Sequence, residues 1–150
     1  MTLLFETPSR SIPITKQMVW DAYRKVKSNK GSAGVDEETL IDFDADLSKN
    51  LYKLWNRLSS GSYFPQCVKA VEIPKGNGGT RTLGIPTIAD RIAQEVVKSY
   101  IEPRLEAVFV PSSYGYRPEK SAHNAIEQVR TNVRDYGWVI DMDIKSFFDE

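Results

Sequence analysis

The sequence has few of the features that mark secreted, membrane-spanning or strongly basic proteins. Its one cysteine, Cys67, excludes an internal disulfide framework and fits a reducing compartment. Twenty basic and twenty acidic residues give a formal net charge of zero, so any basic surface for a nucleic acid must be local. No apolar run approaches membrane-spanning length, and the N-terminus lacks the pattern of a signal peptide. We therefore expect a cytoplasmic protein with no membrane partner.

Helical periodicity is clear in the first part of the chain. Thr15 is placed to cap a helix that runs to about Asn29. Apolar residues then recur at steps of three and four from Leu40 to Leu58, with Gly61 as a stop signal. At 41% hydrophobic residues, the chain can bury a core. The apolar members of the first helix are Met18, Trp20, Ala22, Tyr23 and Val26.

Two further helices are expected in the second half of the chain. One follows Thr87, which with Asp90 three positions later forms a capping-box pattern, and Pro103 should bend or break it near its end. The other opens at Ser121 and ends at Tyr136. Their inner faces should be lined by Ile88, Ile92, Val96, Tyr100 and Leu105 in one, and by Ala122, Ala125, Ile126, Val129 and Val133 in the other.

A change of period from three or four to two predicts a β-hairpin over residues 68–85, with a glycine-rich tip at 76–79. Lys69, Lys75 and Arg81 lie on its arms or beside its tip. Lysine gives a point charge and arginine a two-pronged fork, and together they suit a polyphosphate. Glycines at the tip let backbone amides approach phosphate oxygens. The alternative is that these are ordinary solvated charges on an exposed hairpin.

A second candidate site is the loop from Tyr114 to Pro118. Tyr114, Tyr116 and Arg117 lie there between glycine and proline residues. Two aromatic rings and an arginine can stack on bases and contact a nucleic-acid backbone. An aromatic anchor that fixes the loop to the core is an equally good interpretation.

Acidic residues alternate with apolar ones near the end of the sequence. Asp141 and Asp143 are two positions apart, so in a strand they share one face, opposite Ile140, Met142 and Ile144. Carboxylates beside a buried strand need a cation, and Mg²⁺ is the usual one. An ordinary strand that ends in solvated acids is the alternative. Together with the hairpin and the aromatic loop, however, the carboxylates have the components of a nucleotidyl-transfer site.

These segments, in this order, resemble bacterial group II intron-type reverse transcriptases. The resemblance runs from about residue 20 to the end and includes a match to polymerase motif A. The matching motifs are Gly34-Val35-Asp36, Ile73-Pro74-Lys75, Arg81 to Thr87, Asp90 to Gln94, Ser113 to Pro118, Ser121-Ala122-His123 and Asp141 to Asp149.

The resemblance implies roles in nucleotide and metal binding. Asp143 would be the first metal-binding aspartate, and the backbone carbonyl of Ile144 a further Mg²⁺ ligand. Lys75 and Arg81 would hold the triphosphate of the incoming dNTP, with Lys69 as a weaker candidate. Phe148 would lie under the sugar and exclude ribonucleotides.

It also implies contacts with nucleic acid. Arg117, with Tyr114 and Tyr116 on the same loop, would contact the RNA template and the DNA or RNA primer. The loop that contains Lys30 and Gly31 would lie over the template. Intron RNA is a further partner that the resemblance implies.

The expected fold class is α+β, a mainly helical fingers subdomain with a β-hairpin and the first strand of a palm. Residues 1–35 would be an N-terminal extension, 36–136 the fingers and 137–150 the start of the palm. The parent protein would catalyse RNA-templated DNA synthesis. Because the second aspartate pair of reverse transcriptases is absent from this sequence, we expect the 150 residues alone to be inactive, and an unpaired palm strand to favour self-association.

Two alternatives remain open. One is an RNA-binding, maturase-like module without polymerase activity, which the retention of Asp143, Lys75, Arg81 and Phe148 argues against. The other is an RNA-dependent RNA polymerase, which is disfavoured because Phe148 would occupy the space that a ribose needs.

Overall fold

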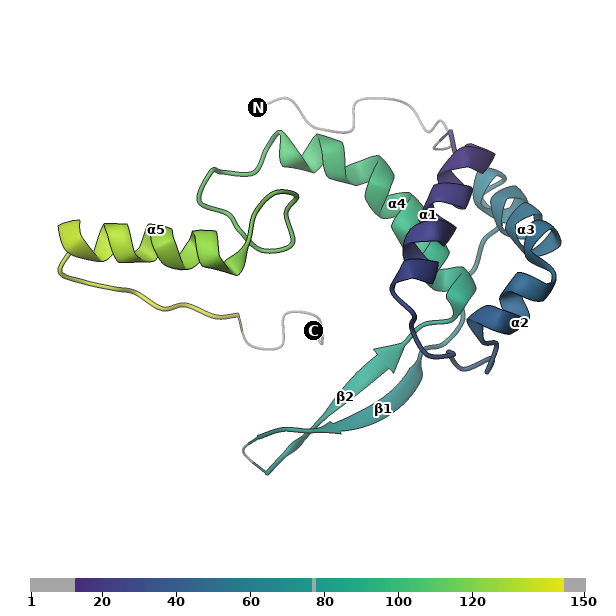
Figure 1. Ribbon diagram of the computed structural model, residues 1–150, viewed down its shortest axis with the longest axis horizontal. Coiled ribbons are helices and arrows are strands. Elements are labelled where there is room, and N and C mark those ends of the chain that lie inside the picture. Colours follow the sequence, from purple (N-terminus) through teal and green to yellow (C-terminus); the bar gives the residue numbers. More distant parts are fainter. Residues whose placement is uncertain (1–12, 77, 145–150) are drawn as a thin grey trace. The chain divides into compact units, whose positions relative to one another are not determined.

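The computed structural model describes residues 13–76 and 78–144 (Figure 1). The fold class is α+β, as predicted. The chain divides into two compact units between Pro103 and Arg104. The described elements are the helices α1 (Lys16–Ser28), α2 (Leu40–Ala45), α3 (Leu47–Ser59), α4 (Ile88–Glu106) and α5 (Ala122–Asp135), and the strands β1 (Lys69–Pro74) and β2 (Thr80–Ile85).

The first helix begins where the sequence predicts. The Thr15 side chain accepts a hydrogen bond from the Met18 backbone N–H at 3.2 Å, which is the expected N-cap. Two details of the buried face differ from the prediction, however. Trp20 is 41% exposed and lines a groove instead of the core, whereas Val19 is buried. At 3.6 residues per turn these neighbours lie about 100° apart, so only one of them can face the core.

The apolar series from Leu40 to Leu58 forms two helices. The break is at Asp46, whose φ of −118° and ψ of 34° are not helical. A capping box between Thr39 and Asp42 starts α2, and the apolar spacing continues in α3, which packs against α1. Phe43 and Leu54 are both buried, so each helix contributes to the same core.

The predicted β-hairpin is confirmed. The two strands are antiparallel, with paired positions running from Lys69 and Ile85 at the base to Pro74 and Thr80 at the tip. It extends away from the helices of the first unit (Figure 1).

The long helix α4 supplies as many buried core residues as α1, four each. Ile88 and Ile92 are fully buried, and Val96 is 1% exposed. The helix continues through Pro103 to Glu106, so the predicted break does not occur. Pro103 has no N–H to donate to the carbonyl of Ser99, four residues earlier, and its ring crowds that carbonyl, so the last turn of α4 is weakened but continues.

The second unit differs most from the expectation. Helix α5 begins with a capping box between Ser121 and Asn124, but Ile126, Val129 and Val133 are each more than half exposed. Residues 138–144 form no strand. A strand needs a hydrogen-bonded neighbour, and no segment among the described residues pairs with this one.

No helix among the described residues is long and apolar enough to cross a membrane.

Candidate functional site

The tip of the hairpin brings Lys75 and Arg81 together. Arg81 pairs with Ile73 across the two strands, and Lys75 follows directly after the end of β1. The tip is closed by hydrogen bonds from the Lys75 N–H to the Gly79 carbonyl at 2.6 Å and from the Gly78 N–H to the Lys75 carbonyl at 3.1 Å. Both cationic side chains are exposed, so they are accessible to a ligand.

Lys69 is at the opposite end of the hairpin. It pairs with Ile85 at the base, six residues from Lys75, which corresponds to about 20 Å along an extended strand. The three cations therefore do not form a single cluster. Lys75 and Arg81 are one pair, and Lys69 is a separate charge.

The chain that enters the hairpin is fixed by a buried carboxylate. Asp90, which is 3% exposed, accepts hydrogen bonds from the Thr87 hydroxyl at 2.7 Å, from the Gln66 N–H at 3.3 Å and from the Tyr63 hydroxyl. Burial of Tyr63 and its bond to this carboxylate raise the pKa of the phenol well above its usual range. The residues before β1 are thus attached to the first turn of α4.

The chain that leaves the hairpin is fixed by Arg91. Its Nε donates to the Pro86 carbonyl at 3.1 Å, and its NH2 group donates to the Ser32 carbonyl. The second contact reaches across to the loop between α1 and α2. A single side chain thus connects the base of the hairpin to the loop that contains Lys30 and Gly31.

Close packing explains the glycines of this loop. A Cβ atom on Gly34 would lie 2.7 Å from the Thr87 backbone, and one on Gly31 would overlap the guanidinium of Arg91. Lys30 has a φ of 46°, in the left-handed region, and its side chain is exposed. The loop therefore rests against the start of α4, with the ammonium group of Lys30 accessible.

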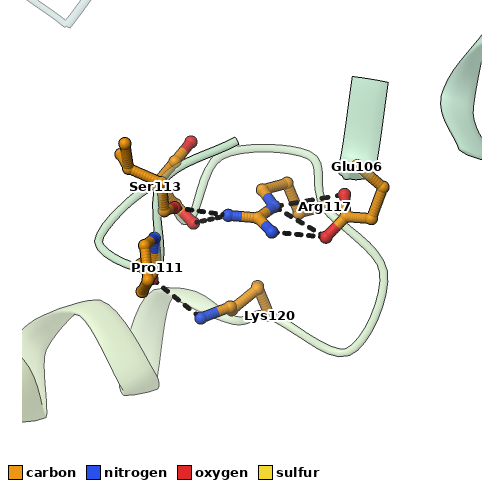
Figure 2. A network of polar contacts seen from close by, with 6 residues as sticks. Glu106, Pro111, Ser113, Arg117 and Lys120 are labelled. Atoms are coloured by element: carbon orange, nitrogen blue, oxygen red, sulfur yellow. Dashed lines mark hydrogen bonds and ion pairs between the residues drawn. The ribbon is translucent and has the colours of Figure 1, made fainter. Parts of the chain in front are cut away.

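Arg117 anchors the loop that follows α4 (Figure 2). Its Nε lies 2.9 Å from Oε1 of Glu106, and its NH1 group donates to the carbonyls of Val110 and Ser113 at 2.8 and 3.0 Å. The Arg117 side chain is 8% exposed. The ion pair lowers the pKa of the Glu106 carboxyl and raises the pKa of Arg117. These contacts favour the anchoring interpretation over a direct contact with nucleic acid.

The two tyrosines of this loop differ in availability. Lys120 places its ammonium 4.8 Å from the centroid of the Tyr114 ring and donates to the Pro111 carbonyl at 2.9 Å. Tyr116 is fully exposed and has a φ of 55°. Of the two rings, Tyr116 is the one that the loop presents to solvent.

The acidic residues Asp141 and Asp143 lie on exposed chain. Asp141 and Asp143 are exposed, as is Ile144. A carboxylate and a backbone carbonyl are oxygen donors of the kind that Mg²⁺ prefers, so their chemistry fits the predicted ligands. The described residues contain no group of three or more potential metal ligands. Phe148 lies outside the described residues.

Sequence reasoning missed three of the positioning residues. The predicted site assigns no positioning role to Asp90, Arg91 or Glu106. The sequence predicts Asp90 only as part of a helix cap, not as a buried carboxylate. The local signal for Asp90 was its spacing from Thr87. Arg91 lies in the matching motif Asp90 to Gln94, but local spacing indicates neither its contact nor that of Glu106, because the partners are 59 and 11 positions away.

A reverse transcriptase (RNA-dependent DNA polymerase) family model matches residues 73–150, which include the hairpin tip, Asp90, Arg91 and the carboxylates. The chain belongs to this family. Its relatives indicate the group II intron type, as the sequence motifs predicted. Protein YkfC of Escherichia coli is 40% identical over 93% of this chain and 39% of its own length.

Two further relatives have names that refer to introns. The group II intron-encoded protein LtrA of Lactococcus lactis is 36% identical over 85% of this chain and 21% of its own length. Nuclear intron maturase 1 of Arabidopsis thaliana is 34% identical over 43% of this chain and 9% of its own length. The chain thus spans less than two fifths of the length of these relatives.

Proposed function

We propose that this chain forms the nucleotide-binding fingers and the beginning of the palm of a group II intron-type RNA-directed DNA polymerase. The observation that carries the proposal is the pair of exposed cations, Lys75 and Arg81, on a hairpin tip with a close turn of small residues. The family membership supports it. The domain limits proposed are residues 1–35 for the N-terminal extension, 36–136 for the fingers and 137–150 for the start of the palm.

In the proposed reaction a primer 3′-hydroxyl attacks the α-phosphate of a dNTP, and pyrophosphate leaves. Lys75 and Arg81 would hold the triphosphate, and their charge would offset the negative charge on the leaving pyrophosphate. Asp143 and the Ile144 carbonyl would hold Mg²⁺, which when bound activates the hydroxyl and neutralises charge on the phosphates. Phe148 would exclude the 2′-hydroxyl of a ribonucleotide.

The proposed nucleic-acid contacts are divided between the two units. Lys30 and the backbone at Gly31 would contact the RNA template, because the loop that carries them is held against the base of the hairpin. Tyr116 would contact the template–primer, while Arg117 and Tyr114 would shape the loop that presents it. Lys69 would have at most a minor role, since it is at the far end of the hairpin from Lys75.

The test is nucleotide kinetics in a full-length enzyme that carries this sequence. Lys75→Ala and Arg81→Ala should each lower kcat/KM for a dNTP by about 1.5–3 kcal/mol, as expected for a lost charged hydrogen bond. Arg81→Lys should recover only part, because the fork geometry is lost. Lys98→Ala, which removes an exposed lysine from α4, is the matched control. Unchanged nucleotide kinetics in both alanine variants would contradict the proposal.

A second prediction tests the role of Phe148. Phe148→Val should raise the incorporation of ribonucleotides while affecting dNTP incorporation less, because the smaller side chain leaves room for a 2′-hydroxyl. The measurement is the ratio of kcat/KM for a dNTP and its matching rNTP. Phe147→Val is the control and should leave this ratio unchanged. If the ratio collapses only in the Phe147 variant, the motif register is shifted by one residue and Asp143 is not the metal ligand.

A maturase-like RNA-binding protein without polymerase activity is the second candidate. The observation that favours it is the match to an intron maturase. In that case the dNTP kinetics could not be measured at all, whereas binding of intron RNA would persist.

A further inference from the structure

The first unit has an aromatic groove on the side formed by α1 and α3. It encloses about 520 Å³, and its walls include Trp20 from α1 and Leu51, Tyr52 and Trp55 from α3. Trp20 is 41% exposed and Tyr52 is 56% exposed. The volume lies in the range of small-ligand pockets, about 300–1,000 Å³, so the groove can take one planar ring system such as a nucleobase.

A cation is already placed over these rings. The Lys16 ammonium lies 4.6 Å from the centroid of the Trp55 ring and 5.4 Å from that of Tyr52. The Trp55 indole N–H is satisfied by the Ile14 carbonyl at 3.0 Å, which fixes the ring in position. A flat group that entered the groove would therefore meet a positioned aromatic surface with a positive charge beside it.

A row of positive charge continues from the groove over the outer face of α3. Lys49, Lys53 and Arg57 recur every four residues, so they lie on one face over about 12 Å of helix axis. All three are exposed, and α3 contains no acidic residue. We call Lys49, Lys53 and Arg57 the α3 basic row, and Lys16 of α1 adds a fourth cation at the groove.

These charges are largely available to a partner. The Lys49 ammonium and the Asp46 carboxylate are 4.0 Å apart, and both are more than two-thirds exposed, so the pair contributes little. Among the described residues, the side chains of Lys53 and Arg57 have no hydrogen bond or ion pair, and their electrostatic interactions are with Glu38 and Tyr63, respectively. Asp46 pairs with Lys49 and Glu38 interacts with Lys53, so two acidic groups face four cations when Lys16 is counted with the row.

We propose that the α3 basic row and the aromatic groove bind single-stranded RNA, with one base in the groove and the flanking phosphates along the row. A duplex keeps its base faces stacked and has no ring to offer, whereas an unpaired strand does. An apolar peptide would fill the groove but would not need the row of cations. This surface is separate from the hairpin, and only the choice of RNA over DNA rests on the proposed function.

The experiment is fluorescence anisotropy of a labelled, unstructured RNA with this chain at several salt concentrations. Lys49→Gln and Lys53→Gln should each lower the slope of log K against log salt by about 0.7–1, since each removes one phosphate contact. Tyr52→Ala should weaken binding about tenfold while leaving the slope unchanged, because it removes stacking and no charge. Arg24→Gln is the matched control. It removes an exposed charge from α1 beside a different hollow, and should change neither quantity.

Several results would overturn the proposal. One is a Tyr52→Phe variant that binds RNA as weakly as Tyr52→Ala. Another is a loss of RNA affinity in Arg24→Gln equal to that in Lys53→Gln. The third is a duplex that binds as tightly as the single strand. Concentration-dependent dimerisation that Tyr52→Ala abolishes would identify a second copy as the occupant instead. If DNA of the same sequence binds with equal affinity, the single-strand site is retained and the preference for RNA is contradicted. Failure of the proposed polymerase function is distinguishable, because it would appear in dNTP kinetics of Lys75 and Arg81 variants and not in this assay.

Discussion

At the scale of single residues, arginine has two quite different roles in this chain. Arg81 is exposed on a hairpin with its donors available, whereas Arg117 uses its guanidinium to hold Glu106 and two loop carbonyls. Arg91 also donates to backbone carbonyls. Sequence motifs alone do not separate these roles, because the residue type is the same and only the neighbouring acceptors differ.

The Glu106–Arg117 pair predicts a pH dependence of loop order. Hydrogen bonds from Arg117 lower the pKa of Glu106 below its ordinary value of 4.5. The contribution of the pair to stability is therefore fully present above pH 4.5, and it is lost only as the pH falls through the lower folded-state pKa. The Arg117 Nε–H signal in an NMR titration should persist below pH 4.5. In the wild-type protein the signal should change only at a lower pH, where Glu106 becomes protonated. In Glu106→Gln the signal should show no such change with pH. An identical titration in both proteins would exclude the Glu106–Arg117 pair as the cause.

At the scale of elements, the start of α4 is the junction to which three other segments are attached. Asp90 holds the chain before β1, and Arg91 holds both the chain after β2 and the loop at Ser32. Gly34 lies against the Thr87 backbone in the same place. The packing at this junction requires a residue without a side chain in the loop.

Gly34→Ala should destabilise the first unit by about 1–3 kcal/mol, the usual cost of overpacking. The added methyl would lie 2.7 Å from backbone atoms of Thr87, which cannot move aside as a flexible side chain can. The measurement is the urea unfolding midpoint. Gly76→Ala is the control, since nothing lies within 4 Å of the position that its Cβ would occupy. Equal midpoints for the two variants would show that the loop does not pack here in solution.

The elements were predictable where a local signal specifies them. Thr15 and Ser121 cap their helices as expected, and the glycine-rich tip gives the hairpin. The break at Asp46 was not predictable, because the apolar spacing continues across it. In the candidate site, local patterns give the residue types at Lys75 and Arg81, while the anchoring of Arg117 depends on Glu106, eleven positions away.

At the scale of the whole molecule, the two units differ in how much apolar surface they cover. The first has a core of fully buried residues, whereas α5 has none. Ile126, Val129 and Val133 are more than half exposed, and the apolar residues between Trp138 and Ile144 are exposed on chain without a strand partner. Periodicity predicted that α5 has an apolar face, but it could not indicate what covers that face.

We expect the isolated chain to self-associate through this surface. Sedimentation velocity should show an average mass that rises with protein concentration, because exposed apolar area is removed from water on contact. Val129→Lys should shift this rise to higher concentration. Gln128→Lys, which adds the same charge beside it on the exposed polar face, should not. A monomer at all concentrations, or an equal effect of both substitutions, would contradict the role of α5.

The attachment of the hairpin at one end has a mechanical consequence. Its strands extend about 20 Å from the junction at α4, so a rotation of about 10° at the base displaces the tip by about 3 Å. That displacement is as large as a hydrogen bond is long. Small changes at the base of the hairpin, at Asp90, Arg91 or Gly34, would thus become larger displacements at its tip. Substitutions at the base should therefore alter the contacts of Lys75 and Arg81 with a ligand, although the substituted residues do not contact that ligand.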